Sequence, residues 1–492
     1  MSNKYIIGID QSTQATKALL FDEEGIIISR EDIPHNQIIN EFGWVEHNPV
    51  QIYENTVCAV KGLVEKTAIN KSDIAGVGIT NQRETAVIWD KETGMPVYNA
   101  IVWQCTRGSD ICKRIEDCGD FIRSRTGLQL SPYFSAAKIA WILENVDGLK
   151  KKSEEGRLAY GTIDSWLVYR LTGGKSFKTD FSNASRTQLF HIGGLKWDPD
   201  ICSMFGINVE GLAEVCDSNS CYGETDFEGF LDKSVPIHSV LGDSHAALFG
   251  QNCLTKGMIK ATYGTGSSIM MNIGDKPIFS KAGIVTSVAW RMDGKVQYVL
   301  EGNINYSGAV IRWLKNDLQL IEKTADAESL ASKANPADRT YLIPAFTGLG
   351  APYWKSDATA VICGMTRLTG KAEIAKAALD SIAYQVTDII DMMKYESDVN
   401  IKELRVDGGP AQNNYLMQFQ SNLLDVSVQV PSAEELSGIG TACAAGIAMG
   451  IYDKQKVLEG MKYHTFRPHM DKEERTNKLE GWKRAIGLVI KA

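Results

Sequence analysis

From residue 240 to residue 250 the chain reads Val-Leu-Gly-Asp-Ser-His-Ala-Ala-Leu-Phe-Gly. A short apolar run reaches Gly242, one carboxylate follows, and small and apolar residues at helical spacing come next. This pattern predicts a strand that delivers Asp243 to the N-terminus of a helix. Because Asp is a preferred N-cap residue, the local sequence also allows Asp243 a purely structural role. Acidic, glycine-rich and hydroxyl-rich turns elsewhere in the chain favour a functional role.

A polar turn follows the first predicted strand, which runs from Tyr5 to Asp10. Residues 11 to 17 read Gln-Ser-Thr-Gln-Ala-Thr-Lys, and a second strand begins at Ala18. Backbone N–H groups and hydroxyls in such a turn can hold phosphate oxygens, while Asp10 can hold a metal ion through water. The alternative interpretation is a β-hairpin with a polar tip.

The pattern of strand, polar turn and strand occurs a second time in residues 258 to 272, where the turn is rich in Gly, Thr and Ser. Glycines in its turn allow the backbone to approach a phosphate closely. Two such turns, each beginning a half-chain of similar length, predict a duplicated nucleotide-binding domain with phosphates clamped between the copies. Residues 404 to 414 predict another strand that runs into a Gly-Gly turn and a helix N-terminus, which suits a nucleotide base or ribose.

Four further residues have the chemistry of a polyol site. Arg83 and Glu84 follow a predicted strand. The forked N–H donors of Arg83 and the carboxylate acceptor of Glu84 suit the neighbouring hydroxyls of a polyol; the alternative is a surface ion pair. Trp103 and Tyr133 lie in predicted loops, where aromatic residues are typical of a sugar or polyol site and equally of core packing.

Bulk properties limit the class of protein. A chain of 492 residues predicts two domains, and its net charge of −8 argues against a nucleic-acid partner. The sequence contains no apolar run of about 20 residues, the length needed to span a bilayer. It leaves no room for a signal peptide before the first strand. Ten cysteines without a Cys-x-x-Cys pair predict a reducing, cytoplasmic location.

The chain resembles the FGGY carbohydrate kinases, and within that family most closely the glycerol kinases. The resemblance runs nearly from end to end. It is carried by these segments: Gly8 to Gln11, Phe42 to His47, Gly78 to Thr85, Asn99 to Cys105, Asn183 to Thr187, Thr262 to Gly266, Ala345 to Trp354 and Arg405 to Gly409.

The resemblance implies an α/β fold with two actin-like (RNase H-like) domains that close on an ATP cleft. Residues 1–252 would form the N-terminal domain, with the polyol site and the first phosphate turn. Residues 253–492 would form the C-terminal, nucleotide-binding domain.

The resemblance also assigns roles to individual residues. Asp243 would be the general base, and Asp10 would hold Mg²⁺ through water. The small polyol would be bound by Arg83, Glu84, Trp103, Tyr133, Asp243, Ser244 and Ser268. ATP would be bound by Ser12, Thr13, Gln14, Lys17, Thr265, Gly266, Gly308, Arg312, Gly409 and Asn413.

The activity implied is ATP-dependent phosphorylation of a terminal hydroxyl, with glycerol converted to glycerol 3-phosphate. Two departures from glycerol kinases bear on the substrate: Ser244-His245 replaces the usual Gln-Gln, and Ser268 replaces a usual Phe. Smaller side chains leave room for a C4 or C5 polyol or a ketose, which is the alternative substrate class. Lys17 replaces a usual Arg, and Arg312 occupies a position that is often Gln.

An alternative of another class is a non-catalytic actin-like ATP switch, because fold does not fix function. The family further suggests a homodimer. Residues 225–234 lack both the glycine-rich sugar-bisphosphate loop and the phosphorylatable histidine found in some bacterial glycerol kinases. The sequence therefore predicts neither of those controls.

Overall fold

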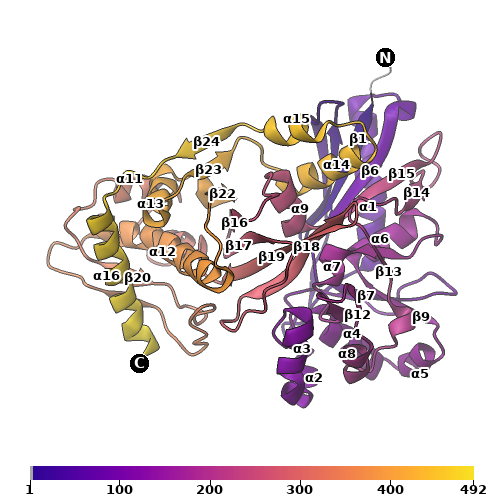
Figure 1. The fold of residues 1–492 in the computed structure, drawn as a ribbon, viewed down its shortest axis with the longest axis horizontal. Helices are drawn as coiled ribbons and strands as arrows, with labels where there is room; N and C mark the ends of the chain where they lie inside the picture. Colours follow the sequence, from indigo (N-terminus) through magenta and orange to yellow (C-terminus); the bar gives the residue numbers. More distant parts are fainter. Residues whose placement is uncertain (1–3, 492) are drawn as a thin grey trace.

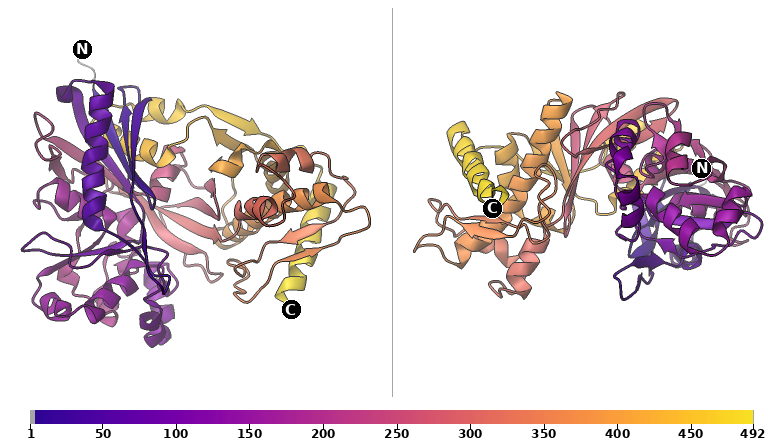
Figure 2. Two further views of the ribbon diagram at one scale, coloured as in Figure 1. Left: turned by 180° about the vertical axis from the view of Figure 1, so that it is seen from behind. Right: turned by 90° about the horizontal axis from the view of Figure 1, so that it is seen from below.

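The computed structural model describes residues 4–491. Two lobes lie side by side: the N-terminal half of the chain forms most of one, and the C-terminal half forms the other (Figures 1 and 2). Each lobe is built on a twisted sheet covered by helices, which is the actin-like α/β architecture predicted from the sequence. The division of the chain between residues 252 and 253 stays a prediction.

A six-stranded sheet forms the centre of the first lobe. Its strands, in spatial order, are β14 (Gly223–Thr225), β15 (Val235–Gly242), β6 (Ile74–Asn81), β1 (Tyr5–Gln11), β2 (Ala15–Phe21) and β3 (Ile27–Pro34). Strand β1 pairs antiparallel with β2 and parallel with β6, which in turn pairs parallel with β15. Parallel strands end at the same edge of a sheet, so the segments that follow β1, β6 and β15 come together there.

The second lobe repeats this connectivity in a seven-stranded sheet. Its strands are β18 (Val285–Met292), β19 (Lys295–Ile304), β17 (Ser267–Gly274), β16 (Met258–Tyr263), β22 (Glu403–Asp407), β23 (Val428–Pro431) and β24 (Tyr463–Phe466). Strand β16 forms a hairpin with β17 and pairs parallel with β22, as β1 does with β2 and β6. The duplication predicted from the two hairpin turns is therefore present.

A five-stranded sheet extends the first lobe. It contains β4 (Ile38–Ile39), β5 (Val45–His47), β8 (Ala100–Ile101), β7 (Ala86–Asp90) and β9 (Leu158–Thr162). Helix α4 (Ser135–Asn145) packs on β7 of this sheet. The remaining helices of this part are α2 (Ser109–Arg114), α3 (Gly119–Thr126), α5 (Leu149–Glu154), α6 (Ile163–Leu171), α7 (Phe181–Ala184) and α8 (Pro199–Met204).

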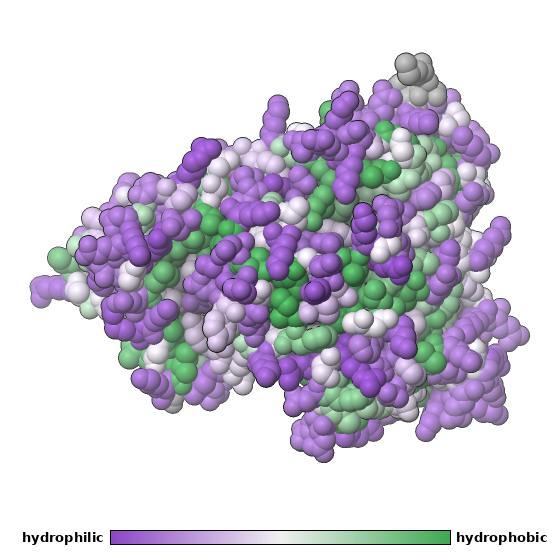
Figure 3. All heavy atoms as spheres, viewed as in Figure 1, coloured by the Kyte–Doolittle hydropathy of each residue, from purple (hydrophilic) through white to green (hydrophobic). Residues whose placement is uncertain are grey.

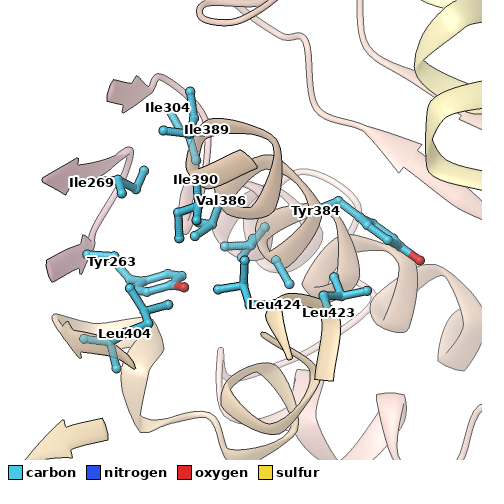
Figure 4. Close-up of a cluster of buried hydrophobic side chains, with 14 of the residues drawn as sticks. Tyr263, Ile269, Ile304, Tyr384, Val386, Ile389, Ile390, Leu404, Leu423 and Leu424 are labelled. Atoms are coloured by element: carbon cyan, nitrogen blue, oxygen red, sulfur yellow. The ribbon is translucent and has the colours of Figure 1, made fainter. Parts of the chain in front are cut away.

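Long helices cover the sheets with their apolar faces. Helix α1 (Pro49–Thr67) packs on β2 and β3 with its buried stripe. Helix α12 (Lys371–Ser397) packs on β17 and β19, where its Val386, Ile389 and Ile390 lie close to Ile269 and Ile304 (Figure 4). The other helices of the second lobe are α10 (Ala309–Asn316), α11 (Asp326–Ala331), α13 (Asn414–Leu424), α15 (Lys454–Glu459) and α16 (Lys472–Ile490).

Helix α14 (Leu436–Ala448) crosses between the lobes. Although it comes from the C-terminal half, it packs on β1, β6 and β15 of the first sheet and on α9 (Asp243–Gly250), as its place in Figure 1 shows. Thr441 Oγ1 donates a hydrogen bond to the Ile79 carbonyl at 3.0 Å. Gly78 permits this close packing, because a Cβ atom there would lie 2.5 Å from the Thr441 carbonyl oxygen.

The surface carries hydrophilic side chains over most of the face in Figure 3, with hydrophobic ones gathered toward its middle. Among residues 4–491, every helix is too short or too polar to cross a lipid bilayer.

Candidate active site

Asp243 lies where the sequence predicts it, between β15 and α9. Gly242, rather than Asp243, is the N-cap residue of α9, and the Asp243 carboxylate accepts a hydrogen bond from the adjacent Ser244 N–H at 2.5 Å. The Asp243 side chain is 36% exposed, so solvent or a ligand can reach it. Gly242 allows Arg83 to approach, because a Cβ atom at residue 242 would lie 2.7 Å from Arg83 Cγ.

Arg83 contacts three other residues of the site. Its Nε lies 3.1 Å from Asp243 Oδ1, and its two terminal nitrogens donate to both carboxylate oxygens of Glu301 at 2.9 and 3.0 Å. Nη2 also donates to Ser244 Oγ at 3.2 Å. With only 6% of the residue exposed, Arg83 is fixed by charge-assisted hydrogen bonds rather than by solvent.

Glu84 is buried and has an unusual backbone. Its φ of 61° is left-handed, a conformation that costs a non-glycine residue about 1 to 3 kcal/mol and is found most often at functional sites. Ser135 Oγ donates to the Glu84 carbonyl at 2.9 Å, and Arg186 Nε donates to its carboxylate at 2.6 Å. The alternative of a surface ion pair between Arg83 and Glu84 is therefore wrong, since each is buried and paired with another residue.

Glu301 and Arg186 complete the charged part of the site. Arg186 Nη1 lies 3.1 Å from Glu301 Oε2, and both side chains are almost fully buried. Burial alone would raise the pKa of Glu301, but the positive charges of Arg186 and Arg83 hold it well below its ordinary value. Five residues thus form a row of alternating charge, which we call the charge row: Asp243, Arg83, Glu301, Arg186 and Glu84. Neither Glu301 nor Arg186 was predicted as a site residue: Glu301 adjoins no recognisable turn, and Arg186 lies in the segment Asn183 to Thr187, which carries the family resemblance without a role assigned to it.

Trp103 and Tyr133 lie together beside this row, with ring centroids 5.5 Å apart. The Trp103 indole N–H donates to Thr13 Oγ1 at 3.0 Å, which joins the predicted polyol side to the N-terminal phosphate turn. A buried lysine that we did not predict, Lys138, fixes the Tyr133 loop by donating to the carbonyls of residues 132 and 133 at 2.6 and 2.5 Å.

The N-terminal turn is the tip of the β1–β2 hairpin. Ser12 Oγ donates to the Ala15 carbonyl within the turn, and Gln14 is exposed at the tip. Lys17 pairs with Glu435 from the C-terminal half at 2.7 Å. The hairpin of the alternative interpretation is therefore present, and its turn contacts Trp103. The role of this turn in holding phosphates stays a prediction.

Asp10 is the last residue but one of β1, directly before this turn. Burial raises its pKa to about 7, with a further increase from the Asp243 carboxylate nearby and a partly compensating effect of Lys17. Among residues 4–491, no side chain donates a hydrogen bond to the Asp10 carboxylate or forms an ion pair with it. A buried carboxylate that lacks a bound cation suits Mg²⁺, which prefers oxygen ligands and usually keeps several waters.

The C-terminal half contains a cavity of about 420 Å³. Five predicted nucleotide-binding residues line it: Thr265, Gly308, Arg312, Gly409 and Asn413. Eight further lining residues were not predicted as binding residues: Gly264, Ile311, Thr324, Ala325, Glu328, Leu379, Pro410 and Gln412. Gly264, Pro410 and Gln412 adjoin predicted residues in the two turns. The other five come from α10, α11, the segment before α11, and α12, whose sequences contain no loop motif.

Two glycines and one side-chain contact shape the mouth of this cavity. A Cβ atom at Gly266 would lie 2.3 Å from the Ile304 carbonyl oxygen, and one at Gly308 would lie 2.4 Å from the Gly264 carbonyl oxygen. Arg312 donates to Thr265 Oγ1 at 2.6 Å. Gly266 supports the loop without lining the cavity, whereas Arg312 supplies a positive charge at its edge.

A two-lobed actin-like fold, with a partly exposed carboxylate at a helix start in one lobe and a cavity of about 420 Å³ in the other, is typical of a phosphotransferase of the actin-like class. The chain belongs to the FGGY family of carbohydrate kinases: the model of the family's N-terminal domain matches residues 5–250, and that of its C-terminal domain matches residues 259–449. It is therefore an ATP-dependent carbohydrate kinase.

Full-length relatives support this assignment. The chain is 46% identical to a glycerol kinase of Oceanobacillus iheyensis over 490 residues, which cover 99% of this chain and 98% of that protein. It is 45% identical to a glycerol kinase of Listeria monocytogenes, with 99% of each chain covered. Its fold is similar to the crystal structure of Plasmodium falciparum glycerol kinase with ADP, with a TM-score of 0.94, 34% identity, and 99% of this chain and 98% of that chain covered.

Proposed function

We propose that this protein transfers the terminal phosphate of ATP to a terminal hydroxyl of glycerol, giving glycerol 3-phosphate. The observation that supports this most directly is Asp243, a partly exposed carboxylate fixed by Arg83 at the start of α9. The similarity to full-length proteins named glycerol kinase supports glycerol as the acceptor.

In the proposed reaction Asp243 accepts the proton from the attacking hydroxyl, as a general base. Arg83 and Glu84 bind the other hydroxyls, and the rings of Trp103 and Tyr133 pack on the carbon chain. Water is a competing acceptor, so a site built from buried side chains between two lobes favours transfer to the polyol.

ATP is proposed to bind with its base and ribose in the 420 Å³ cavity, held by Thr265, Gly308, Arg312, Gly409 and Asn413. Its phosphates would then lie between the two hairpin turns, near Ser12, Thr13, Gln14, Lys17 and Gly266. Phosphoryl transfer needs mainly positioning and charge neutralisation. Asp10 would hold Mg²⁺ through water, and the ion when bound neutralises charge on the phosphate oxygens.

Two further properties are proposals. The ten cysteines are all free thiols, which supports a cytoplasmic location. A homodimer is what membership of the family suggests.

A second candidate function is phosphorylation of a C4 or C5 polyol or a ketose. Ser244 Oγ lies 3.2 Å from Arg83 Nη2, and Ser268 Oγ lies 3.4 Å from Glu301 Oε1. Both small side chains therefore adjoin the charge row, where longer ones would reduce the space for a substrate. His245, by contrast, is buried and faces Ser287 Oγ at 3.2 Å. A non-catalytic ATP switch has no such support, because it needs no polyol site.

The test is the initial rate of ADP release with Mg-ATP against glycerol, erythritol, threitol, xylitol, ribitol, arabitol, dihydroxyacetone and xylulose. We expect the highest kcat/KM with glycerol and a loss of about 10²- to 10⁴-fold in kcat for Asp243→Asn. A preference for a longer acceptor would favour the second candidate. Full activity of Asp243→Asn would contradict the proposed mechanism.

A further inference from the structure

Glu301 is the central member of the charge row, and it comes from a different lobe than the other four. It lies on β19 in the C-terminal sheet, whereas its partners follow β6, precede β11 (Phe190–His191) or begin α9. Its carboxylate is fully buried and contacts Arg83, Arg186 and Ser268. Glu301 is thus the link between the C-terminal sheet and the predicted polyol-binding residues.

The hydrogen bonds of Arg83 show that Glu301 sets the orientation of its guanidinium group. A guanidinium has five N–H groups. Nε–H faces Asp243, two more N–H groups bond to Glu301, and a fourth bonds to Ser244, which leaves one for a substrate hydroxyl. The bidentate contact with Glu301 therefore sets the plane of the guanidinium, and that plane determines where Nε meets the Asp243 carboxylate.

Arg186 extends the same control to the other side of the row. It binds Glu301 through Nη1 and Glu84 through Nε, so one buried carboxylate holds both arginines. The Glu301 carboxylate offsets the positive charges of the two buried guanidinium groups. Without it, the two arginines would repel one another, and each would move toward its other carboxylate partner.

We propose that Glu301 is a positioning residue for phosphoryl transfer, which orients Asp243 through Arg83 and Glu84 through Arg186. The inference rests on the proposed function. It also means that the general base is oriented correctly only while the C-terminal sheet stands in its place against the first lobe.

The first test is Glu301→Gln, which keeps the shape of the side chain and removes its charge. We expect kcat to fall by about 100-fold, because small misplacements of reacting groups have effects of this size, with the KM for ATP within twofold of the parent value. The matched control is Asp198→Asn, which neutralises another buried carboxylate, paired with Arg125 at 2.9 Å and outside the charge row. It should lower the melting temperature while leaving kcat unchanged.

Glu301→Asp covers the possibility that the Gln variant folds poorly. It retains the charge on a shorter side chain, so we expect it to fold and to have a kcat between those of the parent and Glu301→Gln. A kcat equal to that of the parent would overturn the inference, because the placement of the carboxylate would then have no effect.

A double variant tests whether Glu301 acts through Arg83. If it does, Arg83→Gln combined with Glu301→Gln should lose clearly less than the product of the two single losses, since the part of the Glu301 effect that runs through Arg83 is already gone in Arg83→Gln. Losses that multiply would overturn the inference, as would a kcat of Glu301→Gln within twofold of the parent value. A parent protein that phosphorylates none of the eight acceptors would overturn the proposed function, and this inference with it.

Discussion

Glu301 and Asp10 are two buried carboxylates of one active-site region, and their surroundings are opposite. Glu301 is saturated by two arginines, which hold its pKa well below the ordinary value. Asp10 is influenced by a single cation, Lys17, against three carboxylates, Asp243, Glu435 and Asp32, and burial raises its pKa to about 7. The difference teaches that the protein supplies its own cations to Glu301, whereas the structure gives Asp10 no paired side-chain cation among residues 4–491, which suits the proposed role of Asp10 toward Mg²⁺.

The strongest test of this comparison removes one cation from the saturated side. Arg186→Met leaves the buried Glu84 and Glu301 each with one partner fewer, so the free energy of unfolding should fall by about 3 to 5 kcal/mol. Urea unfolding would measure the change. The control is Arg114→Met at the exposed pair with Glu144, where the loss should stay below about 1 kcal/mol. Equal losses would mean that burial of the charge row carries no special cost.

Removal of the unsaturated carboxylate should act on catalysis instead. Asp10→Asn eliminates the negative charge that would attract Mg²⁺, and we expect a fall in kcat of about 100-fold that added Mg²⁺ does not restore. Initial rates over a range of Mg²⁺ concentrations would show it. Asp22→Asn, in the turn after β2, should retain the parent rate. If kcat of Asp10→Asn recovered at high Mg²⁺, the carboxylate would affect only the affinity for Mg²⁺.

Close backbone contacts shape the proposed nucleotide cavity, whereas charged side chains form the proposed polyol site. An added methyl group at the cavity should therefore weaken the binding of ATP and leave the binding of the polyol unchanged. Gly308→Ala keeps an allowed helical φ of −58°, but its Cβ would press on the Gly264 carbonyl. We expect the KM for ATP to rise about 10-fold, or 1.4 kcal/mol, with the KM for the polyol unchanged.

Gly487→Ala in α16 is the matched control, because nothing lies within 4 Å of the added Cβ. Equal effects of Gly308→Ala on both KM values would show that the two sides of the cleft are not separable.

The smallest effect concerns a third buried carboxylate, Asp388, whose contacts are the Tyr353 hydroxyl and the Trp482 indole N–H. Burial raises its pKa to about 7 despite these two donors. The folded protein therefore keeps this proton up to about pH 7, whereas the unfolded chain releases it near the ordinary value of 3.8. At this site stability falls as pH rises from about 4 to about 7.

Asp388→Asn has no proton to lose, so its free energy of unfolding relative to that of the parent should rise by about 1 kcal/mol between pH 6 and pH 8. Thermal melts at the two pH values would measure this. A stability difference that does not change with pH would show that the pKa of Asp388 is not raised in the folded protein.

The fold was predictable because its signals are local. The hairpin turns after β1 and β16 identified the duplication. The predicted strand and helix around Asp243 are also present. These features depend on residues close together in the chain, where periodicity and turn chemistry are informative.

The contacts of the active site were not predictable in the same way. Arg83 and Glu301 are 218 residues apart, and Lys17 and Glu435 are 418 apart. A lone Glu in a strand gives no sign of the arginines that it will meet. Glu84 shows the same limit, because its left-handed backbone is unusual for Glu and follows from the contacts around it.

The placement of α14 has a consequence for biosynthesis. Its residues are among the last tenth or so of the chain to be made, yet they cover the first sheet to form. Until α14 has been synthesised, the sheet formed by β1, β6 and β15 has one apolar face exposed to solvent. Exposed apolar surfaces of this kind bind chaperones and promote aggregation. The N-terminal lobe therefore finishes folding after, and not before, most of its partner has been synthesised.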